Sequence, residues 1–301
     1  KEGIMEKGKS RKKGSKAHYF FLAPHMLIFL IFFFIPFIYG IYISFTKWDM
    51  FSKPQWIGFE NYLTLFTNKD SSFYRQFWNG FGNTLRFVIM IVPFQIAVPL
   101  IIALALYAKP KGARIFQGII YIPTLFSISA VILTWFFILH PSYGLINKLF
   151  GLEINWFGEQ PYAWTSIIIV TIWWIIGLNM VIYVAALGGI DSSIIESAQI
   201  DGAGGGGRII HIYIPLIKFP LLFTILSATT SQFNIYGQPL MLTKGGPTES
   251  TFVLIMYIRN LAFGSGKPIA GIASAMAVIL GVVIGIFSVA QMIVLIKLQD
   301  E

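Results

Sequence analysis

Residues 191–215 read DSSIIESAQIDGAGGGGRIIHIYIP, and this stretch decides how the rest of the chain is interpreted. Ser193, followed three residues later by Glu196, matches a capping box and predicts the start of a helix. Glycines at 202 and 204–207 predict that this helix stops after about two to three turns. A helix this short is unstable alone because nucleation is unfavourable. We therefore expect a loop that docks into a partner.

The composition of the chain is that of a membrane protein. Mean hydropathy is +0.72, hydrophobic residues make up 56% and charged residues 12%, whereas soluble domains carry about 25% charged residues. The absence of cysteine excludes a disulfide framework and a cysteine-based metal site. The net charge of +9 is concentrated in the N-terminal tail and short loops, without an aromatic-plus-basic module, so we expect no nucleic-acid partner.

Six apolar runs are long enough to cross a membrane, which takes about 20 residues. They cover residues 19–45, 84–107, 115–139, 164–187, 212–236 and 271–296. The first is too long for the apolar part of a signal peptide and lacks a small-residue cleavage site, so it should remain as a span. Pro24 and Pro36 predict kinks in it. We expect an all-α membrane protein with six transmembrane helices, organised as a basic tail (1–18) and one transmembrane domain (19–301).

Lysine and arginine predict the orientation of these spans. Seven lie in residues 1–16 and three in the turn at 109–114, and with Arg208, Lys218 and Lys297 one side of the membrane holds 13 of the 22. The positive-inside rule then places both termini and the 191–215 loop in the cytosol. Binding of the tail to anionic lipid is the alternative to a role in topology alone.

The loop also resembles a known sequence pattern. Glu196-Ser197-Ala198, three residues, Gly202, nine residues and Ile212–Pro215 follow the spacing of the EAA loop of ABC-importer permeases, although residues 204–207 depart from it as a run of glycines. Residues 57–62 and 242–247 are similar to Gly-Leu-Glu-Asn-Tyr and Leu-Thr-x-Gly-Gly-Pro stretches of carbohydrate-uptake permeases. The chain resembles the larger channel subunit of maltose importers.

This resemblance implies a type I ABC importer permease fold, with a cytosolic coupling loop between the fourth and fifth spans. It implies a multi-pass protein of the bacterial cytoplasmic membrane, surrounded by lipid. Its partners would be a second permease subunit, two ABC ATPase subunits, an extracytoplasmic sugar-binding protein and a sugar substrate. The chain would be a transport subunit without enzymatic activity, cofactor or metal, because ATP and Mg²⁺ would bind to the partner ATPases. The expected ATPase-coupling residues are Ile195, Glu196, Ser197, Ala198, Asp201, Gly202, Ala203 and Arg208.

Neutral polar and aromatic residues in the fourth and fifth spans are candidates for a sugar path. Amides can bond sugar hydroxyls, and aromatic rings can stack on the apolar ring faces. Phe233-Asn234 also match a Phe-Asn pair that contacts sugar in the maltose-type permeases. Hydrogen bonding between helices is the alternative role for each amide. The candidates are Trp174, Asn179, Phe233, Asn234, Tyr236 and Gln238.

Small residues recur every fourth position in the last run. They are Ala273, Ala277, Gly281 and Gly285. Such a face lets two helices approach closely in lipid. It could meet a partner subunit or another helix of this chain, and both alternatives stay open.

Two short motifs that suggest nucleotide binding do not occur in the sequence context that such a site requires. Residues 202–207 fit G-x-G-x-x-G but follow a helix, and residues 264–267 lack the earlier glycine and the Ser or Thr of a P-loop. The four histidines are isolated, which does not favour a metal site. The expected function is therefore an ABC-importer permease for oligosaccharides or related sugars. An ABC permease for another solute, such as a polyol phosphate, is the nearest alternative, followed by an ATP-independent carrier or an intramembrane enzyme.

Overall fold

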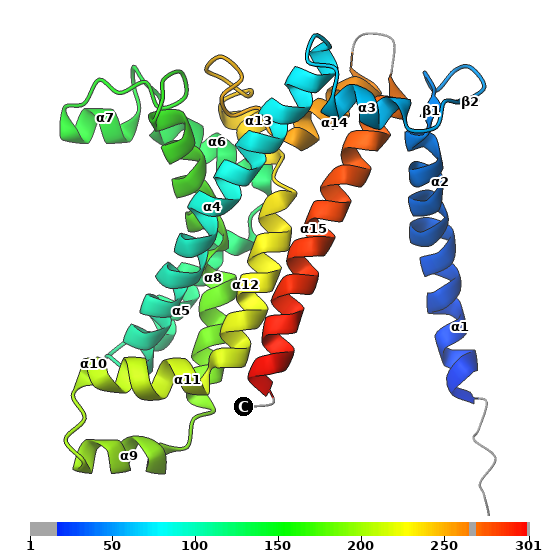
Figure 1. The fold of residues 1–301 in the computed structure, drawn as a ribbon. Coiled ribbons are helices and arrows are strands. Elements are labelled where there is room, and N and C mark those ends of the chain that lie inside the picture. The colour runs from blue at the N-terminus through cyan, green and yellow to red at the C-terminus, as the bar shows by residue number, and fades with distance from the viewer. Residues whose placement is uncertain (1–16, 265–268, 300–301) are drawn as a thin grey trace, which may run out of the picture.

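The computed structural model describes residues 17–264 and 269–299, and the described part is made of helices and one pair of short strands (Figure 1). The predicted basic tail therefore lies outside the described residues, except for its last two. Four helical segments are long and apolar enough to cross a membrane by themselves. They are Phe21–Ser44, which combines α1 (Ala17–Phe29), the π-helical turn η1 (Leu30–Phe34) and α2 (Ile35–Ser44), and the helices α4 (Ser72–Tyr107), α8 (Tyr162–Gly188) and α15 (Ala270–Gln299).

Two further apolar segments are bent pairs of helices. The helix α5 (Ala113–Tyr121) and the 3-10 turn η2 (Ile122–Leu125) meet α6 (Ile128–Ile138) at 104°. The segment Gly205–Leu216 meets α12 (Lys218–Phe233) at 73°. Counting each bent pair as one span gives up to six, and counting only the straight helices gives four. The hydrophobic pattern of the sequence does not predict these two bends.

Prolines explain two irregular turns. A proline has no N–H to bond the carbonyl four residues earlier. The residue before each proline, Ile35 or Ile214, instead donates its N–H to the carbonyl five positions earlier. This bond produces the π-helical turns η1 and η3 (Ile209–Tyr213). The irregularity expected at Pro36 thus takes the form of a π-helical turn, whereas Pro24 lies inside the regular helix α1.

The short elements gather at the two ends of the helix bundle (Figure 1). One end, called here the α14 end, carries β1 (Thr46–Lys47), β2 (Gln55–Trp56), α3 (Glu60–Phe66), α7 (Leu145–Phe150), α13 (Gly237–Leu242) and α14 (Leu254–Phe263). The strands β1 and β2 pair antiparallel, with Thr46 opposite Trp56. The other end, the α9 end, carries the C-terminal part of α15 and the elements α9 (Ser192–Ile200), α10 (Gly205–Arg208), η3 and α11 (Ile214–Leu216).

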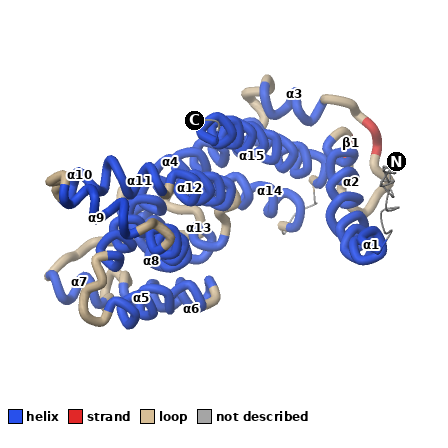
Figure 2. The backbone as a smooth tube through the Cα atoms, turned by 90° about the horizontal axis from the view of Figure 1, so that it is seen from below, coloured by secondary structure: helices blue, strands red, loops and turns tan. Residues whose placement is uncertain are grey.

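The centre of the bundle is formed by α4, α8 and α12, which lie side by side in both views (Figures 1 and 2). The helix α5 approaches α8 closely at Gly177, where an added Cβ would lie 2.7 Å from the Cα of Tyr121. Three apolar clusters fill the bundle, around Phe87, Leu254 and Tyr183.

The first span and the C-terminal part of α15 bury little of their surface, whereas the first turns of α15 are buried. Only 6% of the apolar window is buried in each, compared with 33% for α4 and 39% for α8. The segment α1–α2 contacts α15 through α2 and stands apart from the rest of the bundle (Figure 1). On α15 the predicted small-residue face is split, since Ala273 is buried whereas Gly281 and Gly285 are exposed and have open space where a Cβ would lie.

Candidate functional site

The helix α9 is held at both ends by well-defined caps. At its start, the carboxylate of Asp191 accepts a hydrogen bond of 2.9 Å from the backbone N–H of Ser193. The hydrogen bonds from the Ser193 backbone and hydroxyl hold the pKa of Asp191 below its usual value of 3.8. At its end, Gly202 adopts φ +79°, Ala203 N–H bonds the Ala198 carbonyl at 2.9 Å, and Gly202 N–H bonds the Gln199 carbonyl at 3.1 Å. This is a Schellman motif, which explains why position 202 requires glycine.

Two details of the predicted loop are wrong. The N-cap is Asp191, not Ser193, because Ser193 already lies in the first turn, where its carbonyl accepts the hydroxyl of Ser197. The glycines 204–207 do not stop the helix either. Gly202 ends it, and Gly204 is the N-cap of the following helix α10, with φ −63° and ψ 165°.

The exposed surface of α9 is partly apolar. Ile200 is 87% exposed and Ile194 43% exposed, so both side chains are accessible to a partner. Sequence reasoning missed both, because helical spacing alone does not show which side of α9 faces the rest of the loop. The predicted coupling residues divide into exposed Glu196, Ser197, Asp201 and Gly202 and half-buried Ile195, Ala198, Ala203 and Arg208.

A lysine links the second half of this loop to the last helix. The Nζ of Lys218 donates a hydrogen bond of 2.7 Å to the carbonyl of Leu298, near the C-terminus of α15. The last carbonyls of a helix have no partner within the helix and carry partial negative charge, so a cation is stabilising there. Lys218 begins α12 directly after the 73° bend. The bend and the end of α15 are therefore held together.

Asn179 lies in a buried polar cluster between helices. Its Nδ2 donates to the carbonyl of Gln95 at 3.1 Å, and the Oε1 of Gln95 accepts from the Nε2 of Gln232 at 2.9 Å. The Gln95 carbonyl is free within α4 because Pro99, four residues later, has no N–H. Asn179 thus donates a hydrogen bond to a carbonyl that has no partner within α4. This is the alternative role, hydrogen bonding between helices, that the sequence left open for this amide.

The other residues proposed for the sugar path have different surroundings. The Nε1 of Trp174 donates to the Phe126 carbonyl at 3.0 Å, at the break between η2 and α6. Phe233 is fully buried and packs against the ring of Phe287, whereas Asn234 is exposed and donates to the Thr230 carbonyl at 2.9 Å. Tyr236 is half-buried and Gln238 is buried. Of the Phe-Asn pair, only Asn234 reaches the surface in this conformation.

The loop that follows α13 is strained and firmly tied to α4. Thr248 and Glu249 adopt positive φ angles of 46° and 59°, which non-glycine residues rarely do. The Glu249 carbonyl accepts a hydrogen bond of 2.9 Å from the Nδ2 of Asn83. Burial, together with the carboxylate of Glu249 to which its hydroxyl donates, raises the pKa of Tyr257 to about 12. Gly245 has φ +84°, and an added Cβ would collide with Phe252, which explains a glycine in the 242–247 patch.

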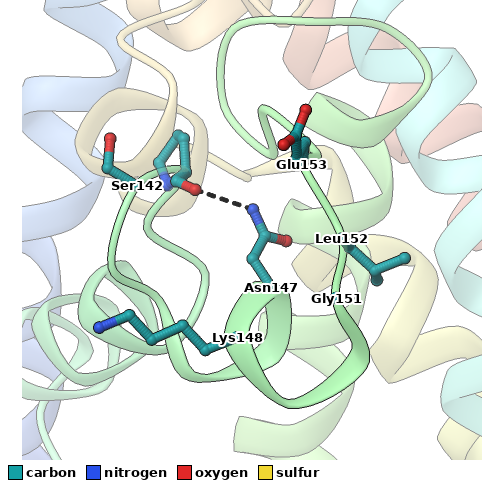
Figure 3. Close-up of a pocket in the computed structure, with 7 residues that line it drawn as sticks. Ser142, Asn147, Lys148, Gly151, Leu152 and Glu153 are labelled. Carbon is teal, nitrogen blue, oxygen red and sulfur yellow. Dashed lines mark hydrogen bonds between the residues drawn. The ribbon is translucent and has the colours of Figure 1, made fainter.

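A hollow of about 510 Å³ is formed by residues 141–153, around α7 in the connection from α6 to α8 (Figure 3). The side-chain amide of Asn147 already bonds the loop itself, because its Nδ2 donates to the carbonyls of Pro141 at 3.0 Å and Ile154 at 2.9 Å. Lys148 and Glu153 lie on opposite sides of the view in Figure 3. The polar groups do not converge on one point, so this hollow is not a binding-site candidate. Within the described residues, no three His, Asp or Glu side chains could hold a metal ion.

Comparison with known proteins identifies the family. The sequence model of the family described as "binding-protein-dependent transport system inner membrane component" matches residues 96–296. The chain belongs to this family. A probable ABC transporter permease of Bacillus subtilis, YesP, is 30% identical, over 94% of this chain and 92% of the relative. The probable starch degradation products permease AmyD of Thermoanaerobacterium thermosulfurigenes is also 30% identical, over 94% of this chain and 95% of the relative.

Solved structures agree with this assignment. A bacterial ABC transporter involved in the import of the acidic polysaccharide alginate matches with a TM-score of 0.78 at 25% identity, over 91% of this chain and 93% of that chain. The same kind of transporter, in complex with a periplasmic protein carrying an alginate pentasaccharide, matches with a TM-score of 0.79 at 26% identity, over 91% and 92%. The predicted resemblance to ABC-importer permeases is confirmed, and so is a multi-pass inner-membrane protein. The orientation of the termini stays a prediction.

Proposed function

We propose that this chain is the transmembrane permease subunit of an ATP-driven ABC importer for oligosaccharides or related sugars, with six spans and its α9 end in the cytosol. Family membership and relatives named for sugar transport support the substrate class. One observation carries the coupling role. The helix α9 is capped at both ends and projects from the bundle with Ile194 and Ile200 exposed. The described residues leave these two side chains exposed, and a short helix is stabilised mainly by tertiary packing, so a partner surface would stabilise it.

The proposed partner of α9 is a cleft in an ATPase subunit. Movement of the ATPases on binding ATP would carry α9 with them. The following segment, α10 to α11, continues into α12 through the 73° bend, and Lys218 ties that bend to α15. A displacement of α9 would therefore reach both α12 and α15. Of the predicted coupling residues, the exposed Glu196 and Asp201 would contribute polar contacts.

A second permease subunit would complete the molecule. The first span and α15 each bury only 6% of their apolar window, and Gly281 and Gly285 on α15 are open. Small residues permit close helix contact. We propose this part of the small-residue face as the seam with the second permease, and the part at Ala273 as packing within this chain. The extracytoplasmic binding protein would meet the α14 end.

The test is affinity purification of this chain, with its bound partners, from its native membrane, followed by quantitative mass spectrometry. We expect a P-loop ATPase and a second multi-span permease in stoichiometric amounts. The Ile200→Asp variant should no longer co-purify with the ATPase but should still co-purify with the second permease, because it places a charge in the apolar contact. Ile210→Asp is the matched control, since Ile210 is 62% exposed in the same loop but lies outside α9. A chain that purifies without either partner contradicts the proposal.

A further inference from the structure

The last two turns of α12 expose polar side chains, whereas its first turns expose Phe219 and Phe223. Its exposed positions in the outer two turns are Ser227, Ser231 and the C-capping Asn234. By contrast, the exposed positions of α4 include Ile89, Phe94 and Ile101, and those of α15 include Val282, Ile286 and Val289. Serine and asparagine on an outward face in the membrane indicate a surface that lines water or protein, because lipid tails cannot satisfy them.

The serine hydroxyls of this face are free to bind a ligand. Buried Thr224 and Thr229 of the same helix donate to backbone carbonyls, at 2.8 and 2.7 Å, which is the usual way to satisfy a hydroxyl in a membrane helix. Within the part of the chain that the structure describes, neither Ser227 nor Ser231 makes a side-chain hydrogen bond. We call the exposed positions 227, 231 and 234 the α12 polar stripe.

An arginine lies at the α14 end of the α12 polar stripe. The guanidinium of Arg259, on α14, is 5.9 Å from the ring centre of Tyr236. Tyr236 follows Asn234 by two residues, with the buried Ile235 between them, in the segment that joins α12 to α13. The contact orients the guanidinium by a cation–π attraction and leaves its five N–H donors unused. Sequence reasoning missed Arg259 because it lies between the spans and not within them.

No counter-ion accounts for Arg259. The side chain is exposed, and no carboxylate of residues 17–264 or 269–299 lies within ion-pairing distance of it. The acidic residue that precedes α14, Glu249, is bonded by Tyr257 at 3.0 Å. Tyr257 and Arg259 are two positions apart in a helix and therefore point about 200° apart. Glu249 is thus held on the other side of α14.

We propose that Arg259, Tyr236 and Asn234 form a subsite for an anionic group, a carboxylate or a phosphate, on the transported saccharide. Arginine binds either group through two parallel N–H bonds. Tyr236 holds the guanidinium in place, and Asn234 and the stripe serines bond the hydroxyls of the sugar. The inference rests on the proposed function and narrows its substrate to acidic saccharides.

The test measures uptake in cells whose only copy of this chain is the wild type or a variant. The probes are a labelled uronic-acid trisaccharide, a neutral trisaccharide of the same linkage, and glycerol phosphate. The variants are Arg259→Gln, which removes the charge, Arg259→Lys, which keeps it without the paired donors, and Arg75→Gln, an exposed arginine of α4 at the same end. Quantified co-purification of the partners with each variant serves as the check on folding and assembly.

We expect chain-dependent uptake of an acidic probe, with the trisaccharide and glycerol phosphate separating carboxylate from phosphate recognition. Arg259→Gln should reduce this uptake at least tenfold, mainly through a higher KM, Arg259→Lys should retain part of it, and Arg75→Gln should leave it unchanged. Chain-dependent uptake of the neutral probe alone overturns the inference and leaves the proposed function intact, as does acidic uptake that Arg259→Gln does not alter. Absence of chain-dependent uptake for every probe counts against the proposed function itself.

Discussion

Replacing Gly202 by valine should disconnect the α9 loop from transport. Gly202 has φ +79°, and its Cβ position is open, with nothing within 4 Å. A substitution there is therefore disfavoured by backbone conformation and not by a clash. A non-glycine residue in the left-handed region costs about 1–2 kcal/mol, and a β-branched one lies toward about 3 kcal/mol. Since about 1.4 kcal/mol is a factor of ten, the intact Schellman motif should become at least tenfold less favourable.

Gly204→Val is the matched control. Gly204 also has nothing within 4 Å, but its φ of −63° and ψ of 165° suit any residue. The assay is transport per ATP hydrolysed by the complete complex in proteoliposomes. Gly202→Val should lower this ratio at least tenfold without loss of membrane-inserted chain, and Gly204→Val should change it less than twofold. Equal transport by the two variants would refute the view that the backbone at position 202 sets the docking geometry.

Three further predictions concern the bundle and the start of α9. Asn179→Ala should lower the free energy of unfolding by about 1–2 kcal/mol, because the Gln95 carbonyl, which Pro99 cannot bond, loses its donor. In the Pro99→Ala background, which restores an N–H, this loss of stability should be smaller. A double-mutant cycle in detergent measures the difference. Gly177→Val should destabilise by about 1–3 kcal/mol because its side chain meets the α5 backbone, whereas Gly118→Ala, in open space on α5, should stabilise by about 0.5–1 kcal/mol; thermal unfolding that ranks them the other way contradicts the packing. The pKa of Asp191 is lowered from 3.8 in the folded chain, so its cap is fully stabilising above pH 3.8 and is lost as the pH falls through the lowered value; amide exchange at Ser193, compared with Asp191→Ala, measures this, and identical protection in the two proteins would exclude the cap.

Part of the candidate site was accessible from the sequence because it depends on local conformation. A short helix that ends at Gly202 follows from the glycine itself, since the left-handed residue of a helix end needs no tertiary contact to favour it. The glycines at 204–207 misled the same reasoning, because glycine weakens a helix but does not forbid one, and here the segment continues into η3 and α11.

The apolar runs and the EAA-like spacing determined the class of protein, because a membrane span requires length and hydrophobicity, which are properties of the sequence alone. Tertiary structure alone decided how the polar residues are used. Asn179 serves the carbonyl that Pro99 frees on another helix, and Phe233 and Asn234, adjacent in sequence, lie in the core and on the surface. Arg259 contacts Tyr236 only because α14 comes close to the segment that joins α12 to α13. Such pairings depend on how distant segments pack, and hydrophobic periodicity carries no information about them.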